Sequence, residues 1–304
     1  MLVLPANAKL NLALAVIARR DDGWHDIDTI VVPIDWHDLV GVDIDVDAHA
    51  AVSLRLSGPA TDGVPTGDEN LAVRAGRALI EAAARPLAVT IWLEKRVPHA
   101  AGLGGGSADA AAALRAGIRV LTEQRVAFDE QRLSDATSRL GSDIPALFAL
   151  GPQRITGRGD VASPVVAPGM HVVVVSTEPS ATAAVYAQLA LDEMTDNGRI
   201  DRVADTLAAG RRPDDSLLGS ALEPAAVRAN AALAHALERA RAVMADRRWH
   251  MTGSGGALFT LTNSPADAVA VARRMRESGF RARAGVARGR PRQAVEAQAG
   301  KAPA

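Results

Sequence analysis

Alternating hydrophobic and polar positions predict strands in the first part of the chain. Leucine or valine fills every second position from Leu10 to Val16, a period of two that is typical of a half-buried strand over 9–18. Similar runs predict strands at 28–35 and 39–46. Residues 58–68 are rich in Gly, Pro, Thr and Asp and predict a loop.

The rest of the chain mixes helical and strand patterns. Helices are expected at 70–84, 107–120, 129–139, 144–149, 182–191, 199–209, 226–246 and 265–279. Further strands are expected at 89–94 and 171–177, on both sides of the glycine turn within 249–263, and at the closing segment 280–287. This mixed order, without regular alternation of strand and helix, favours an α+β fold over a doubly wound sheet.

The Gly- and Pro-rich stretch at 151–169 indicates a passage between two halves. We therefore expect one domain over 1–160, a second over 161–288, and a disordered polar tail over 289–304. A chain of 304 residues can bury a sizeable core without a disulfide or a structural metal.

Composition excludes several classes of function. Lys plus Arg is 34 and Asp plus Glu is 35, a formal net charge of −1, so the chain lacks the overall positive field of a general nucleic-acid or membrane-surface binder. It has no cysteine, which excludes thiol catalysis and zinc–thiolate sites and fits a reducing compartment. Protein partners are left open.

The apolar N-terminus does not follow the pattern of a signal peptide. No positive residue precedes it, and Lys9 and Asn11 interrupt it. No apolar run reaches the length of about 18 residues that a membrane span needs. A soluble, cytoplasmic protein without a membrane partner is expected.

Three aspartates at 43, 45 and 47 imitate the spacing of a calcium loop. The glycine expected sixth is Ala48 and the closing acid is Leu54, so we interpret the aspartates as the exposed face of an edge strand.

The strongest chemical signal is a glycine cluster between a predicted strand and a predicted helix, in PHAAGLGGGSADAAAALRAG at 98–117. Such glycines let backbone amides turn towards an anion, and the helix that follows adds its positive end, which favours phosphate binding. The segment lacks the Gly-Lys-Ser/Thr of a P-loop, and Ser107 stands where a dinucleotide fingerprint needs its third glycine. The structural alternative is a tight strand-to-helix turn.

Two other segments indicate the same chemistry. MTGSGGALF at 251–259 is a second glycine-rich turn, and GSDIPALFALG at 141–151 contains Asp143. Taken alone, Asp143 is better interpreted as a helix cap, and Lys9 could be a strand lysine whose ammonium reaches water. Lysine is rare, however: it occurs only at Lys9, Lys95 and Lys301, although arginine is abundant. An ammonium and a guanidinium do different work, which favours a specific role for Lys9 and Lys95.

The order of these segments resembles the GHMP kinase superfamily. The matching segments are ANAKLNL at 6–12, RRDDGWHDIDT at 19–29, GDENLAVRAGRAL at 67–79, EKRVPHAAGLGGGSADAA at 94–111, GSDIPALF at 141–148 and TGSGGALF at 252–259. Together they extend to about residue 288. The resemblance is closest to a branch that acts on a cytidine-diphosphate-linked alcohol in non-mevalonate isoprenoid synthesis.

The resemblance implies a two-domain α+β kinase with its active site in the interdomain cleft. Its implied substrates are ATP, with Mg²⁺, and a small molecule that carries cytidine diphosphate. Lys9 and Asp143 are the implied catalytic residues, and Ser107 is the magnesium-ligand candidate. The implied ATP-binding residues are Asn70, Lys95, Pro98, Gly102, Leu103, Gly104, Gly105, Gly106 and Ser107. The implied substrate-binding residues are Asn11, Trp24, His25, Thr182, Tyr186, Gly253, Ser254 and Gly255.

Two departures from the family pattern concern the substrate end. Trp24 stands where the family usually has tyrosine, which keeps a flat face and loses a hydroxyl. The segment 176–186 is divergent, so Thr182 and Tyr186 are less firmly assigned than Lys9. The alternatives are another small-molecule GHMP kinase of mevalonate or homoserine type, and a nucleotide-binding regulator without turnover.

Overall fold

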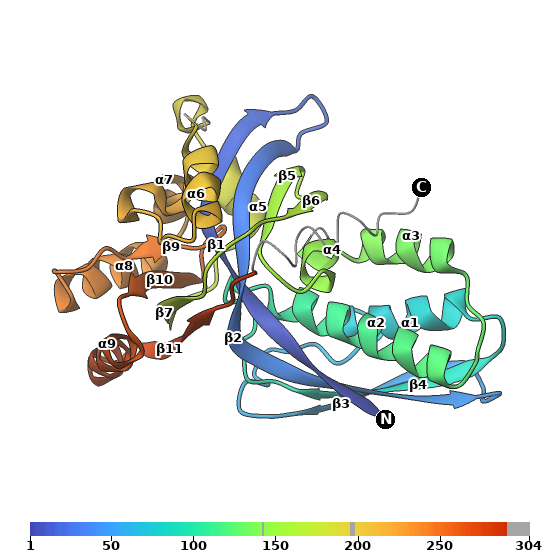
Figure 1. The fold of residues 1–304 in the computed structure, drawn as a ribbon. Coiled ribbons are helices and arrows are strands. Elements are labelled where there is room, and N and C mark those ends of the chain that lie inside the picture. The colour runs from blue at the N-terminus through green and yellow to red at the C-terminus, as the bar shows by residue number, and fades with distance from the viewer. Residues whose placement is uncertain (142, 195–197, 291–304) are drawn as a thin grey trace. The chain divides into compact units, whose positions relative to one another are not determined.

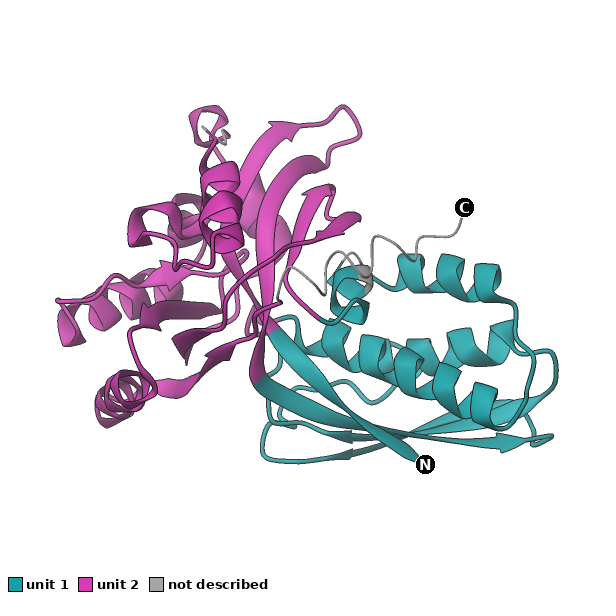
Figure 2. Cartoon of the chain, in the orientation of Figure 1, with its two compact units in different colours: residues 1–8, 36–99, 104–150 teal, residues 9–35, 100–103, 151–304 magenta. Residues whose placement is uncertain are grey.

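The computed structural model describes residues 1–141, 143–194 and 198–290, which form two compact units (Figures 1 and 2). Unit 1 comprises residues 1–8, 36–99 and 104–150; unit 2 comprises residues 9–35, 100–103 and the described residues from 151 onwards. Strands β1 (Leu2–Arg19) and β2 (His25–Val46) therefore contribute to both units. The single boundary expected at residue 160 is wrong, because 9–35 fold with the C-terminal half.

Unit 1 is a sheet with helices on one face (Figure 1). Its strands besides β1 and β2 are β3 (Ala51–Ser57) and β4 (Leu87–Glu94), and β4 pairs parallel to β3 and antiparallel to β2. Its helices are α1 (Leu71–Ala82), α2 (Gly105–Glu123), α3 (Glu130–Leu140) and α4 (Asp143–Phe148). Alternate strand residues such as Val42 and Ile91 pack under the alanine-rich α2 to form the core.

Helices α1 and α2 lie close together because small residues line their contact. A Cβ at Gly117 of α2 would lie 2.2 Å from a terminal methyl of Leu79 of α1, so a larger residue would have to displace the Leu79 side chain. On the sheet, Asp43 and Asp45 are exposed, as expected, in the part of β2 that pairs with β4.

Unit 2 contains an antiparallel sheet in the order β11–β7–β10–β9. Its further strands are β5 (Gln153–Gly157), β6 (Val161–Pro164), β7 (Met170–Ser176), β8 (Gly219–Ser220), β9 (His250–Met251), β10 (Ala257–Thr262) and β11 (Arg281–Ala287). Its helices are α5 (Thr182–Ala187), α6 (Arg199–Ala208), α7 (Glu223–Ala229), α8 (Ala231–Val243) and α9 (Pro265–Glu277), with short 3₁₀ turns at Leu191–Glu193 and Asp215–Leu217. Trp249 and Phe259 are the largest fully buried side chains of its core.

The α+β prediction is confirmed, with differences in detail. The two strands expected at 28–35 and 39–46 are one continuous strand, β2. The helix expected at 226–246 is two helices, because the Asn230 side chain caps the start of α8 by accepting from the amides of Ala232 and Leu233. Strands β3, β5, β6 and β8 were not expected from the sequence.

The C-terminal segment is held by a backbone bridge at residue 290. Arg290 still exchanges backbone hydrogen bonds with Ala167, at 2.8 and 3.1 Å. The remainder of the tail expected from 289, residues 291–304, lies outside the described residues. Within the described part of the chain, no helix combines the length and apolar character needed to span a membrane.

Candidate active site

The glycine loop between β4 and α2 has the backbone geometry of an anion cradle. Ala100, Gly102 and Gly104 all have positive φ, at 55°, 70° and 67°. Gly104 is the N-cap of α2 and provides no side-chain hydrogen bond to the helix. The first amides of a helix lack intrahelical acceptors and lie at its positive end, so this start of α2 is suited to bind a phosphate.

The two glycine-rich turns of the sequence meet within unit 2. A Cβ at Gly102 would lie 2.0 Å from the carbonyl oxygen of Gly255, and a Cβ at Gly256 would lie 2.7 Å from the carbonyl carbon of Ala101. Gly255 also has φ of 112°. Both turns therefore require glycine for close backbone approach, and segments about 150 residues apart in sequence form one feature.

Lys9 lies beside this feature. Its amide donates to the Leu103 carbonyl oxygen at 2.9 Å, and its Nζ donates to Oδ1 of Asn11 at 2.6 Å. A Cβ at Gly253 would lie 3.6 Å from the Lys9 Nζ and 3.2 Å from the Asn11 Oδ1. Lys9 is only 7% exposed, so the interpretation of its ammonium as reaching bulk water does not hold.

The predicted substrate residues of unit 2 form two contacts. The rings of His25 and Tyr186 lie 4.8 Å apart at 35°, and the hydroxyls of Thr182 and Ser254 lie 2.9 Å apart. The contacts join the β1–β2 hairpin to α5, and α5 to the second glycine turn. Burial, and then the Arg19 charge, lower the pKa of His25 below its ordinary value.

Trp24 lies at the tip of the β1–β2 hairpin and is 61% exposed. Its amide donates to Asp22 at 3.1 Å, and the Arg158 guanidinium carbon lies 5.9 Å from its ring centroid. A large apolar ring exposed in a polar turn is available for stacking by a ligand.

Asp143 is the first residue of α4 in unit 1 and is partly buried. Its helix is anchored by Ile144, which is fully buried in the unit 1 core, and by Arg115, which donates to the Leu147 carbonyl oxygen at 3.0 Å. Burial lowers the pKa of Arg115 to about 10. The anchors fix α4, and an acidic residue in its first turn is favoured by the helix dipole.

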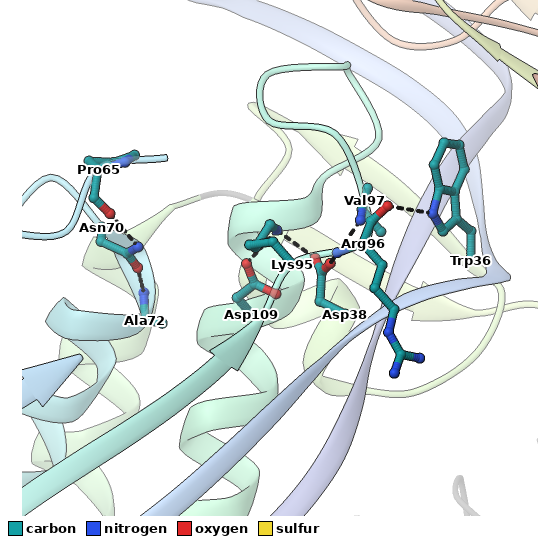
Figure 3. A network of polar contacts seen from close by, with 9 residues as sticks. All are labelled: Trp36, Asp38, Pro65, Asn70, Ala72, Lys95, Arg96, Val97 and Asp109. Carbon is teal, nitrogen blue, oxygen red and sulfur yellow. Dashed lines mark hydrogen bonds and ion pairs between the residues drawn. The ribbon is translucent and has the colours of Figure 1, made fainter. Parts of the chain in front are cut away.

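Lys95, just after β4, lies in a buried network of unit 1 (Figure 3). Its Nζ donates to Asp109 of α2 at 2.8 Å and to Asp38 of β2 at 2.5 Å. The second oxygen of Asp38 accepts from the amides of Arg96 and Val97. Asp38 thus holds the segment that leads into the glycine loop, and Asp109 holds the helix that leaves it.

The charges in this network shift one another's protonation. Burial opposes the charged form of Lys95, but the Asp109 and Asp38 carboxylates outweigh it and raise the pKa of Lys95. Burial raises the pKa of Asp109 well above its ordinary value; Lys95 opposes that shift and Asp38 adds to it. The Oδ1 atom of Asp109 is buried without a hydrogen-bond partner.

Asn70 is the N-cap of α1. Its Oδ1 accepts from the amide of Ala72 at 2.9 Å, and its Nδ2 donates to the Pro65 carbonyl oxygen at 2.7 Å (Figure 3). Both ends of this buried amide are thus engaged in holding the loop before α1.

Comparison with known proteins identifies the family. Residues 70–150 match the profile "GHMP kinases N terminal domain" and residues 191–280 match "GHMP kinases C terminal". A 4-diphosphocytidyl-2-C-methyl-D-erythritol kinase from Nitrobacter hamburgensis is 34% identical over 272 residues, which cover 86% of this chain and 87% of that protein. This chain belongs to the GHMP kinase family. The resemblance in the sequence is confirmed.

Three further matches compare this GHMP kinase with relatives and solved structures. A relative of the same name from Xanthobacter autotrophicus is 35% identical over 294 residues, covering 89% and 92% of the two chains. A crystal structure of 4-(cytidine 5'-diphospho)-2C-methyl-D-erythritol kinase superposes with a TM-score of 0.77 at 31% identity, covering 94% and 98%. A homoserine kinase from Cytophaga hutchinsonii, at 16% identity and a TM-score of 0.62, shares the fold.

The donor groups of this GHMP kinase limit how it could hold a divalent cation. Among the residues that the structure describes, no three or more His, Asp or Glu side chains group as a metal site. Ser107, in the first turn of α2, offers a single hydroxyl oxygen. A single protein oxygen suits Mg²⁺ that arrives with a nucleotide, since phosphates and waters complete its coordination.

Sequence reasoning missed the side chains that hold the predicted ones. Asp38 and Asp109 pair with Lys95, Thr29 contacts Asn11, and Thr252 accepts from the Asn11 amide. Asp38 lies in the polar segment 35–38 between two apolar runs, where the sequence alone does not mark it as buried. The partner, 57 residues away, cannot be identified from the pattern.

Proposed function

We propose that this GHMP kinase transfers the γ-phosphoryl group of ATP to the 2-hydroxyl of 4-diphosphocytidyl-2-C-methyl-D-erythritol, in non-mevalonate isoprenoid synthesis. The observation that carries the proposal is that relatives with this kinase name are 31–35% identical over most of both chains.

The glycine loop supports ATP as the donor. The amides at the start of α2 and the left-handed turns at Gly102 and Gly104 are suited to hold phosphate oxygens. Ser107 would contribute one oxygen to the Mg²⁺ that accompanies ATP. The bound Mg²⁺ supplies neutralisation of the phosphate charge, and the network of Lys95 holds both ends of the loop.

Lys9 and Asp143 are assigned the work at the alcohol. Asp143 accepts the hydroxyl hydrogen and takes its proton as the oxygen forms its bond to the γ-phosphorus and the bond to ADP breaks. Lys9 supplies a positive charge for the negative charge that spreads over the transferring group. Phosphoryl transfer needs positioning and charge neutralisation more than covalent catalysis, and a carboxylate and an ammonium are the groups that such chemistry uses.

The cytidine end is assigned to the hairpin tip. The exposed Trp24 ring offers a stacking face for cytosine, and His25, in tilted contact with the Tyr186 ring, offers a ring nitrogen to the base edge. Burial lowers the pKa of His25, which favours the neutral ring with one donor and one acceptor. The paired hydroxyls of Thr182 and Ser254 add polar groups on the same unit.

The test is ATP consumption by the purified protein with a panel of alcohols. The panel contains 4-diphosphocytidyl-2-C-methyl-D-erythritol, mevalonate, homoserine and galactose, with Mg²⁺ present and absent. Turnover is expected with the cytidylyl substrate alone. Turnover with mevalonate or homoserine would reassign the substrate, and ATP binding without any turnover would favour a regulator.

A further inference from the structure

The amide of Asn11 bridges Lys9 and a threonine that neither the sequence motifs nor the family resemblance singled out. The Oδ1 of Asn11 accepts from the Lys9 Nζ at 2.6 Å, and its Nδ2 donates to the Thr29 Oγ1 at 3.0 Å. Thr29 in turn donates its hydroxyl hydrogen to the Ala13 carbonyl oxygen at 2.7 Å. The three side chains form one continuous chain of hydrogen bonds within unit 2.

The direction of each hydrogen bond in this series follows from what each group can donate and accept. A threonine hydroxyl has one hydrogen, and a carbonyl oxygen can only accept, so the hydrogen of Thr29 is used by Ala13. Towards Asn11 the hydroxyl therefore presents a lone pair, which selects the NH₂ end of the amide. The oxygen end must then face the Lys9 ammonium.

The orientation of the Asn11 amide matters because the groups around it are buried. Thr29 and Asn11 are buried, and Thr252, whose hydroxyl accepts from the Asn11 backbone amide at 2.8 Å, is fully buried. Water does not readily replace a lost partner in such a place, and a reversed amide would point NH₂ at an ammonium.

We propose that Thr29 is a positioning residue for Lys9: it fixes the orientation of the Asn11 amide, whose oxygen holds the Lys9 ammonium in place. The proposal rests on the proposed function, in which Lys9 acts on the transferring phosphoryl group. It also assigns the Asn11 side chain to orienting the catalytic lysine, through its Oδ1 and one of its Nδ2 hydrogens, where the resemblance implies a contact with cytidine diphosphate.

Thr29→Val is the sharpest substitution, because it keeps the shape of the side chain and removes the hydroxyl. Its matched control is Thr29→Ser, which keeps the hydroxyl. The expected result for Thr29→Val is a kcat lower by about 10- to 100-fold, in the range that follows from misplacing a catalytic group. KM for ATP and for the cytidylyl substrate should stay at the parent values, and Thr29→Ser should restore most of kcat.

Asn11→Ala provides a second variant at the centre of the relay. It should lower kcat with KM for the cytidylyl substrate unchanged. Adding Thr29→Val to it should have no further effect, because the two residues act through one path. If Asn11→Ala instead raises KM for the cytidylyl substrate and leaves kcat unchanged, the proposal is overturned and Asn11 returns to the substrate site. This test does not need Thr29→Val to fold.

A readout without substrate separates this proposal from the proposed function. The chain has three lysines, so ¹⁵N-lysine labelling gives three ammonium signals, which Lys9→Arg and Lys301→Arg assign. Thr29→Val should shift the Lys9 signal or broaden it by faster proton exchange. The Lys95 signal, held by Asp38 and Asp109, should not change and serves as the internal control.

The outcomes are distinct. An unchanged Lys9 signal and unchanged kcat in folded Thr29→Val overturn the relay. A shifted Lys9 signal in a protein that phosphorylates nothing in the panel supports the relay and rejects the proposed function. A Lys95 signal that moves together with that of Lys9 indicates general loosening and counts against a specific role of Thr29.

Discussion

Lys9 and Lys95 are both buried lysines, yet their ammonium groups are held by different chemistry. Lys95 donates to two carboxylates, of Asp38 and Asp109, whereas Lys9 donates to the neutral amide oxygen of Asn11. The Asp38 and Asp109 carboxylates offset the charge of the Lys95 ammonium, whereas the Asn11 amide orients the Lys9 ammonium. Lys95 is therefore suited to hold structure together, and the action of Lys9 on an anion stays part of the proposed function.

The elements around the two lysines support this division. Asp38 also accepts from the amides of Arg96 and Val97, so the Lys95 network fixes both ends of the glycine loop. Lys9 is tied by its backbone to Leu103 in the same loop, but its side chain belongs to the Asn11–Thr29 relay. That Lys95 lies beside bound nucleotide stays a prediction from the resemblance.

The largest expected effect separates the two lysines by stability. Lys95→Met leaves two buried carboxylates without their cation and should lower the free energy of unfolding by about 3–5 kcal/mol. Lys9→Met is the matched variant and should lower it by less, because leaving the Asn11 amide oxygen without this donor costs less than leaving two buried carboxylates without their cation. Urea unfolding of both variants measures the difference. Equal losses would show that the two sites do not differ in the way proposed.

The second prediction concerns turnover. Asp143→Asn should lower kcat by at least about 100-fold, the lower range for losing a general base, with ATP binding unchanged. The control is Asp135→Asn on α3, an exposed carboxylate of the same unit, which should have parent activity. Near-normal turnover in folded Asp143→Asn would remove this carboxylate from the mechanism and leave Lys9 without its assigned partner in the chemistry.

The sequence pattern predicts the elements whose limits are set by neighbouring residues. The helix at 265–279 was found because Pro265 follows the capping Ser264 and an amphipathic run comes next. The sequence predicts two strands where the structure has the single strand β2, because residues 35–38 are mostly polar. Asp38 is buried against Lys95, and Asp35 accepts from the Val286 amide at 2.8 Å, and these long-range partners leave no local mark.

The candidate site shows the same limit. The glycine segments could be identified from composition, and their meeting at Gly102 and Gly255 follows from tertiary structure alone. Asn70 is similar: its Oδ1 caps α1 and its Nδ2 holds the Pro65 carbonyl in the loop before the helix, while its place beside ATP stays a prediction from the resemblance. Motif residues are recognised from sequence more readily than the residues that orient them.

A third prediction compares two exposed tryptophans, one in each unit. Trp24 and Trp92 are 61% and 40% exposed, and each has an arginine near its ring. Trp24→Ala should weaken binding of the cytidylyl substrate by about 1–3 kcal/mol, the value of one aromatic–base stack, and Trp24→Tyr should be nearly neutral. Trp92→Ala, on the sheet of unit 1, should change neither KM. If Trp24→Ala raises KM for ATP alone, the hairpin tip does not bind cytidine.

The smallest expected effect is that of Asp109→Asn, which keeps the shape of the side chain and an oxygen that can accept from Lys95. At neutral pH it should change the free energy of unfolding by less than about 1 kcal/mol.

The pH dependence of unfolding is more informative than this single value. Because burial raises the pKa of Asp109 in the folded state, the folded protein binds this proton more tightly than the unfolded chain does. The stability contributed by this group is fully present below its ordinary pKa and is lost as pH rises through the raised value. Asparagine cannot ionise, so Asp109→Asn should become more stable than the parent protein as the pH of the unfolding measurement is raised from about 5 to about 9.

Asp38→Asn is the control. It removes a carboxylate that accepts from the Lys95 ammonium and from two backbone amides, so it should be less stable than the parent at every pH in this range. A loss in Asp109→Asn as large as that in Lys95→Met would mean that both carboxylates are needed in charged form, and that Lys95 is balanced by two full charges.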